Sequence, residues 1–183
     1  MICRAASCPA SSLYWHFDSK ENLFAEVVKW KATNFFGLIS DDVIDVDSFD
    51  EIEDIGDRVA DALQNDPLLL RFLLLLGLER QDMPSEARAI IAQVRESARA
   101  WWQTLLEKRF QDRGATVATM IAEEYAEFGR SLVDGAFFAW DFGDGPDLRK
   151  VFRQLMVLLA ALDNKIMLEE RASTRGDPSS GKA

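Results

Sequence analysis

The sequence predicts an all-α fold, and two observations carry that prediction. Apolar residues recur at three- and four-residue steps through most of the 183-residue chain, which places them on one face of an α-helix. Residues typical of helix starts and stops, chiefly Ser, Asp, Pro and Gly, lie between these segments. Hydrophobic residues make up 48% of the chain, as in globular proteins. We therefore expect packed helices around a buried core.

The first forty residues predict short helical segments joined by tight breaks. In order, we expect a helical stub over 1–6, a turn over 7–9, a helix over Ala10–Phe17 and a long helix from Ser19 to about Ser40. Asp18 or Ser19 can cap the long helix, and Glu21 adds negative charge to its first turn, where the helix dipole favours it. The chain therefore turns sharply between two helices.

Hydrogen-bond donors gather on one side of this pair of helices. The apolar residues Leu13, Phe17 and Leu23 would face inward. The donors that remain outside are Ser11, Ser12, Tyr14, His16 and Lys20. Such side chains meet the phosphates and base edges of nucleic acids. On spacing alone, ordinary surface and capping residues are the favoured explanation.

The same stretch carries a family pattern. The run Ser12-Leu13-Tyr14-Trp15-His16-Phe17, followed by Ser19-Lys20-Glu21 and Leu23, resembles the recognition helix of tetracycline-repressor (TetR) family regulators and the start of their next helix. The preceding residues Ile2 to Pro9 resemble the first half of the family's helix-turn-helix. The resemblance covers about the first 28 residues. It implies a left-handed backbone at Ser7, a position where the family commonly has Gly.

The resemblance also implies DNA contacts. In a helix-turn-helix, the N-terminal end of the recognition helix enters the major groove. The residues assigned to DNA are Pro9, Ala10 and Ser11 nearest the bases, with Ser12, Tyr14, His16 and Lys20 around them. A complete head of this family has a further helix and a basic leader before these residues. We therefore expect an N-terminally truncated head, from a late start codon, a truncated gene or a genuine loss.

The charge distribution is compatible with this interpretation. The net charge of −10 argues against nucleic acid binding by the chain as a whole. Residues 1–40 nevertheless balance at +1, from Arg4, Lys20, Lys29 and Lys31 against Asp18, Glu21 and Glu26. The acidity is densest over Asp41–Asp57, which lacks the alternating ligands and central Gly of a calcium loop. The pattern is typical of a small DNA-reading head on an acidic body.

Five further helices are predicted in the body. They cover residues 48–63, 67–80, 85–111, 116–140 and 146–171. Ser48 and Glu51 form a capping box, Pro67 starts the second helix, and Ser85 caps the third. The second helix is nearly all apolar, so we expect it to be buried on most sides. Residues 172–183 predict a flexible tail.

Aromatic residues on the third and fourth of these helices indicate a ligand pocket. In the TetR family these helices line the effector pocket, and the residues assigned to it are Trp101, Trp102, Tyr125, Phe128 and Phe137. They predict a cavity for a small apolar or aromatic effector. For any single one of them, packed core is the favoured explanation; as a group they could line a cavity. The nearby Glu123, Glu124 and Glu127 would favour a cationic ligand.

The last helix predicts a homodimer. Between Leu155 and Leu162 no position is polar, so this helix needs a second partner besides its own core. The resemblance implies that the last two helices of each subunit form a four-helix interface. The residues assigned to it are Phe152, Leu155, Met156, Leu159 and Leu162.

Several other classes of protein are disfavoured. The longest apolar runs, Phe72–Leu78 and Leu155–Leu162, are far short of a membrane span of about 20 residues. The chain does not open with a secretory leader, so we expect a cytoplasmic protein with reduced, buried Cys3 and Cys8. His16 has no companion nucleophile or second carboxylate, and we expect no enzyme, no cofactor and no metal site.

The predicted function is therefore a TetR-like DNA-binding regulator, taken as a repressor, that a small-molecule effector releases from its operator. Residues 1–40 would form the partial head and connecting helix, 41–171 an antiparallel helical effector-binding and dimerisation domain, and 172–183 the tail. The alternative is a helical dimerisation or small-molecule-binding module that does not bind DNA. The effector, the operator and the sign of regulation are not encoded in any feature above.

Overall fold

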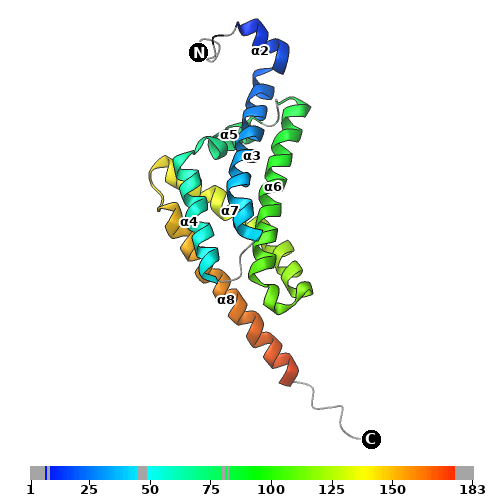
Figure 1. Cartoon of the computed structure of the whole chain (residues 1–183), viewed down its shortest axis with the longest axis vertical. Coiled ribbons are helices and arrows are strands. Elements are labelled where there is room, and N and C mark those ends of the chain that lie inside the picture. The colour runs from blue at the N-terminus through cyan, green and yellow to red at the C-terminus, as the bar shows by residue number, and fades with distance from the viewer. Residues whose placement is uncertain (1–6, 8, 45–48, 80, 82, 176–183) are drawn as a thin grey trace, which may run out of the picture.

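The structure is a computed structural model that describes residues 7, 9–44, 49–79, 81 and 83–175, and this part of the chain is helical with no strand. The predicted all-α fold is confirmed. The elements are α2 (Ala10–Phe17), α3 (Lys20–Ile44), α4 (Phe49–Asn65), α5 (Leu68–Leu78), α6 (Ser85–Arg109), the 3-10 turn η1 (Gln111–Arg113), α7 (Ala115–Phe142) and α8 (Leu148–Arg175). The molecule is elongated, with α2 at one end and the C-terminal half of α8 at the other (Figure 1).

Two hydrophobic cores lie along this length. One core joins α4, α7 and α8 to the second half of α6, and Phe110 and Phe137 are fully buried in it. The other core joins the first half of α3 to α5 and the first half of α6, around Val28 and Leu76. α3 contributes to both cores, because its later residue Ile39 is buried in the first one. None of the described helices has the length and apolar character needed to cross a membrane.

The helices occupy the segments that the sequence predicts, and the differences are confined to the residues at their ends. Ser19 caps α3, because its Oγ accepts a hydrogen bond of 3.0 Å from the backbone N–H of Asn22. Ser7 has φ of 51°, which confirms the left-handed turn position. Ser85 does not cap α6: it is the first helical residue, and Pro84 precedes it without a side-chain capping bond. The proposed capping box at Ser48 lies outside the described residues.

The prediction that the apolar helix after Pro67 is buried on most sides is wrong for the single chain. Leu69 and Leu76 are buried, but Leu68 and Leu75 are exposed and Leu78 is 85% exposed. The physical reason is that α5 contacts α3 and borders α6 along one side only, which leaves its other side to solvent. An all-apolar sequence does not reveal which side has a partner.

The apolar residues of α8 divide between two faces, and the residues that the sequence assigned to a dimer interface lie on the inward face. Phe152, Leu155, Met156 and Leu159 are at most 6% exposed and pack in the subunit's own core, while Leu162 is half-buried against it. Because α8 packs against α4 and α7, these side chains are not available to a partner. The apolar residues that α8 does expose are Val157, Leu158 and Leu168.

Candidate functional site

α2, which the sequence predicts to be a recognition helix, presents polar and aromatic side chains to solvent. Ser11, Tyr14 and His16 are exposed, Ser12 is half-buried, and Trp15 is 80% exposed. Pro9 and Lys20, which flank the helix, are exposed as well. The exposure of Ala10 lies outside the described side chains. Leu13 and Phe17 are half-buried on the opposite side, as the spacing predicts.

A tight corner fixes α2 to the start of α3. Asp18 takes a positive φ of 57°, and its backbone N–H donates to the carbonyl of Tyr14 at 3.0 Å. The next residue, Ser19, then caps α3. Lys20 follows in the first turn, with its ammonium group 5.2 Å from the ring centre of Phe24. The exposed face of α2 is thereby held in a defined direction relative to α3.

α3 is in turn attached to the body. Phe24 stacks on Phe72 of α5 with ring centres 5.5 Å apart, and the Lys31 ammonium group pairs with the Asp66 carboxylate. This ion pair lowers the pKa of Asp66, chiefly through the hydrogen bond from Lys31. Because the corner at Asp18 and Ser19 holds α2 to the start of α3, a movement of α3 relative to α5 would carry α2 with it.

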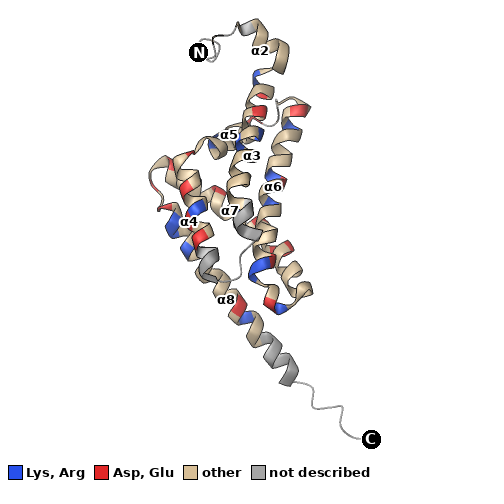
Figure 2. Cartoon of the chain, viewed as in Figure 1, with Lys and Arg blue, Asp and Glu red and all other residues tan. Residues whose placement is uncertain are grey.

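Charge on the head is sparse. α2 contains no Lys, Arg, Asp or Glu, and Figure 2 shows it in a single neutral colour at one end of the molecule. The nearest described cation is Lys20. Contacts from α2 to DNA would therefore be hydrogen bonds and aromatic contacts, with little phosphate neutralisation.

A cavity of about 90 Å³ lies in the body where the two hydrophobic cores meet. Its walls come from α3, α4, α5, α6, α7 and α8 and are mostly apolar. Trp101, Trp102 and Phe137 line it, together with Phe36 of α3 and Phe152 of α8. Trp102 stacks parallel to Phe152 at 6.4 Å and meets Trp101 edge-on at 5.3 Å. Such a wall suits a flat or flexible apolar molecule.

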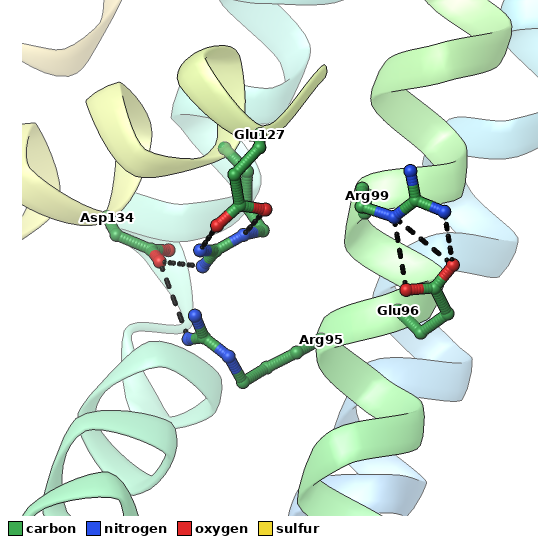
Figure 3. Close-up of polar contacts among 6 residues, drawn as sticks. Arg95, Glu96, Arg99, Glu127 and Asp134 are labelled. Atoms are coloured by element: carbon green, nitrogen blue, oxygen red, sulfur yellow. Dashed lines mark hydrogen bonds and ion pairs between the residues drawn. The ribbon is translucent and has the colours of Figure 1, made fainter. Parts of the chain in front are cut away.

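An ionic cluster built around the buried Arg130 borders this cavity. The Arg130 guanidinium, which is buried, donates from Nε to Glu127 at 3.0 Å and also bonds the Asp134 carboxylate. The hydrogen bonds from Arg130 lower the pKa of Glu127, while burial raises the pKa of Asp134. Arg95 approaches Asp134 from α6 at 3.8 Å (Figure 3). Arg95, Arg130 and Asp134 thus place charge at one side of an otherwise apolar pocket.

The N-terminal segment has a known counterpart. Residues 1–27 match the family model described as "Bacterial regulatory proteins, tetR family". The resemblance to TetR regulators is confirmed over these residues. No protein among curated sequences matches the chain significantly. The matched segment ends within α3 and includes the exposed face of α2 and the corner that follows it.

The TetR match supports a transcriptional regulator whose DNA-binding element is a helix-turn-helix. Proteins of this family regulate transcription and are not enzymes. Among the side chains that the structure describes, no group of three His, Cys, Asp or Glu residues could hold a metal ion.

Two residues assigned to the pocket from the sequence lie elsewhere. Phe128 is 54% exposed on the outer face of α7, and Tyr125 packs against the first core without lining the cavity. The pocket-facing positions of α7 are Arg130, Val133 and Asp134, together with Phe137. The sequence placed the aromatic residues on the correct helix but did not define which side of the helix faces the cavity.

Sequence reasoning also missed the ionic cluster and the exposed Trp15. Glu127, Arg130 and Asp134 are spaced three and four residues apart, which could have indicated a paired group on one helix face. Arg95 could not have been found in this way, because it belongs to another helix. Glu123 and Glu124, expected near the ligand, are exposed and do not line the cavity.

Proposed function

We propose that this chain is a dimeric TetR-type repressor, cytoplasmic, that a small apolar or aromatic effector releases from its operator. The observation that carries the proposal is the TetR match over residues 1–27, together with the exposed face of α2 that those residues form. We take residues 1–40 as the head and connecting helix and 41–171 as the effector-binding and dimerisation body. Pro9, Ala10, Ser11, Ser12, Tyr14, His16 and Lys20 are the proposed DNA contacts.

Trp15 joins this set of proposed contacts. It is the most exposed aromatic side chain on α2 and lies one helical turn beyond Ser11. Its ring meets that of His16 edge-on at 4.9 Å. A large apolar side chain held in water on the helix that faces DNA favours contact with a thymine methyl group or a sugar.

The proposed dimer uses the outward faces of α7 and α8. Their exposed apolar residues are Met120, Phe128, Phe138 and Phe142 on α7 and Val157, Leu158 and Leu168 on α8. Monomeric proteins rarely leave so many large apolar side chains exposed on neighbouring helices. Burial of these two faces in a second copy accounts for them and gives the head a twofold partner, as an operator with two half-sites requires.

The dimer has a direct test. Leu158→Glu places a charge on the proposed interface, while Leu78→Glu places the same charge on the exposed side of α5, away from that interface. We expect sedimentation equilibrium to give a dimer for the parent chain and Leu78→Glu, and a monomer for Leu158→Glu. A dimer that survives Leu158→Glu unchanged would show that these faces of α7 and α8 are not the interface.

The effector site is proposed at the cavity between the two cores. Trp101, Trp102 and Phe137 contribute to its wall, and so does Phe36 of α3. A molecule that fills the cavity must contact α3, the helix that bears α2. It would favour one position of α3 over another and so change the separation of the two heads.

Binding to DNA is tested by fluorescence anisotropy with random duplex DNA at several salt concentrations. The chain is compared with the product read from about forty codons further upstream, a length set by one more helix and its leader. Affinity that falls steeply with salt in either form supports the regulator. Within the form that binds, Trp15→Ala should weaken binding by roughly ten-fold, and Trp30→Ala, an exposed Trp on α3, should leave it unchanged. No binding by either form would refute the proposal.

A second candidate function has its own observation. Because α2 carries no charged side chain, the head contributes little electrostatic affinity. The body alone would then act as a helical dimerisation or ligand-binding module. Dimerisation and ligand binding that persist without any DNA binding would favour this candidate.

A further inference from the structure

The apolar cavity continues into a second, polar one. An open groove of about 490 Å³ lies between α5, α6 and the middle of α7. Arg95 and Arg130 line both the groove and the cavity, so the two spaces meet at these arginines. A single ligand can therefore place an apolar body in one space and a polar end in the other.

The groove is positively charged although the protein is acidic. Its charged residues are Arg88, Arg95, Arg99 and Arg130 against Glu96 and Glu127, a balance of +2. Most of this charge is internally paired: Arg99 Nη2 donates to Glu96 at 2.7 Å, and Arg130 is held by Glu127 and Asp134. The arginines without such bonds determine what the groove can bind.

Of the two groove arginines without such bonds, Arg88 and Arg95, Arg95 is the one that also lines the apolar cavity. It reaches Asp134 only at 3.8 Å, which is beyond hydrogen-bond distance, and its guanidinium makes no hydrogen bond to the described residues. Figure 3 shows Arg95 extending from α6 toward Asp134, apart from the closed Arg99–Glu96 pair. An arginine fork presents donors that match a carboxylate or phosphate in two parallel bonds.

A cationic ligand has no comparable acceptor in this site. The Asp134 carboxylate already accepts a hydrogen bond from Arg130 and faces Arg95 at 3.8 Å, so two guanidinium groups of the protein already balance its charge. Both carboxylate oxygens of Glu127 already accept hydrogen bonds from Arg130, one from Nε and one from Nη2. The expectation that nearby glutamates favour a cation is therefore not met by the arrangement of these side chains.

We infer that the ligand of this site is an amphipathic organic anion. Its apolar body fills the cavity beside Trp102, and its carboxylate or phosphate is received by Arg95 where the cavity opens into the groove. This inference rests on the proposed effector site and adds the chemical class of the effector.

Isothermal titration calorimetry with four ligands of equal chain length tests the inference on the intact chain. The probes are octanoate, octyl phosphate, 1-octanol and octylamine, which share one apolar body and differ in head group. We expect at least one of the two anions to bind about ten-fold or more tightly than the neutral alcohol, and the amine to bind weakest. The two anions together distinguish a carboxylate head from a phosphate head.

Arg95→Gln isolates the head-group contact. It should reduce the affinity for the preferred anion about ten-fold or more, to the level of 1-octanol, while the affinity for 1-octanol stays unchanged. The matched control is Arg71→Gln, which removes one positive charge from α5 outside both spaces, where Arg71 pairs with Asp141. It should leave all four affinities unchanged.

The outcomes separate this inference from the proposed function. Equal binding of the anions, alcohol and amine would overturn the anionic class but leave an apolar effector pocket in place. Preference for octylamine, or an Arg95→Gln effect equal to that of Arg71→Gln, would also overturn it. Binding by none of the four would overturn both this inference and the effector site. The proposal of a TetR-type regulator is tested separately, because only the DNA-binding measurement can refute it.

Discussion

The close approach of α6 and α7 at Gly129 predicts that the methyl group added by Gly129→Ala lowers stability relative to the same substitution at an open helix position. A β-carbon placed on Gly129 would lie 2.8 Å from Cε3 and 2.9 Å from Cδ2 of Trp102. Real β-carbons essentially never approach so closely, and Trp102 is 5% exposed with Phe152 stacked on it. Gly129→Ala must therefore push a buried indole that forms part of the pocket wall.

The expected magnitude follows from two opposing effects. Overpacking of a dense core costs about 1–3 kcal/mol, while Ala in place of Gly in a helix interior stabilises by about 1 kcal/mol. The net change for Gly129→Ala is thus a loss of roughly 0–2 kcal/mol. Gly37 of α3 is the matched control, because nothing lies within 4 Å of a β-carbon there. Gly37→Ala should gain about 0.5–1 kcal/mol.

The assay is urea unfolding followed by circular dichroism at one protomer concentration, since the proposed dimerisation would make the apparent stability depend on concentration. Gly129→Ala should lie about 0.5–3 kcal/mol below Gly37→Ala, a difference in midpoint of roughly 0.3–1.5 M urea. If Gly129→Ala and Gly37→Ala stabilise the protein equally, the Trp102 ring does not lie against Gly129 and the close contact of α6 and α7 is refuted.

Three further predictions use the same unfolding assay. Phe110→Ala empties a fully buried site and should destabilise by about 3–5 kcal/mol; a loss below about 1 kcal/mol would mean that the core is not closed there. Arg113 donates to Asp163 at 2.7 Å and lowers the pKa of that carboxyl, so the folded state favours the charged form. Its contribution is present above the ordinary pKa near 3.8 and is lost as the pH falls through the lowered folded value. Asp163→Asn should therefore cost about 1 kcal/mol at pH 7, allowing for solvent screening, and the cost should shrink as the pH falls below 4; a cost independent of pH would contradict the ion pair. Arg149→Ala removes an exposed ion pair with Asp61 and should change stability by less than about 0.5 kcal/mol, whereas a loss comparable to that of Phe110→Ala would show that α4 and α8 depend on it.

Much of the fold could be predicted because helices are local. The helix from Ala10 to Phe17 was predicted to the residue, and α6, α7 and α8 begin within two residues of the predicted positions. Their spacing of apolar residues and their Pro and Gly breaks are properties of neighbouring residues. Caps were less certain, since Ser19 and Ser85 look alike in sequence and only Ser19 accepts a capping bond.

The candidate site was less predictable because it depends on which helices meet. α8 is apolar on two faces, and only its packing against α4 and α7 shows that Met156 faces inward and Leu158 outward. Arg95 and Arg130 come from different helices and meet at the junction of two cavities. A pattern confined to one helix contains no information about such a pair.

α3 connects the cavity with α2, because one continuous helix runs from one to the other. Its residue Ile39 lines the cavity, and Lys20 begins the helix beside α2, a separation of about 28 Å along one continuous helix. A tilt of about 5° at the cavity therefore moves the α2 end by about 2.5 Å. The tilt must break or carry along the Lys31–Asp66 pair and the Phe24–Phe72 stack, which hold α3 against α5. Since α5 also lines the cavity, a ligand that displaces α5 moves the support of α3 as well as α3 itself. In the proposed dimer, a displacement of this size in each subunit would disturb contacts to two half-sites about 34 Å apart, so a small expansion of the cavity would be sufficient for the proposed release from DNA.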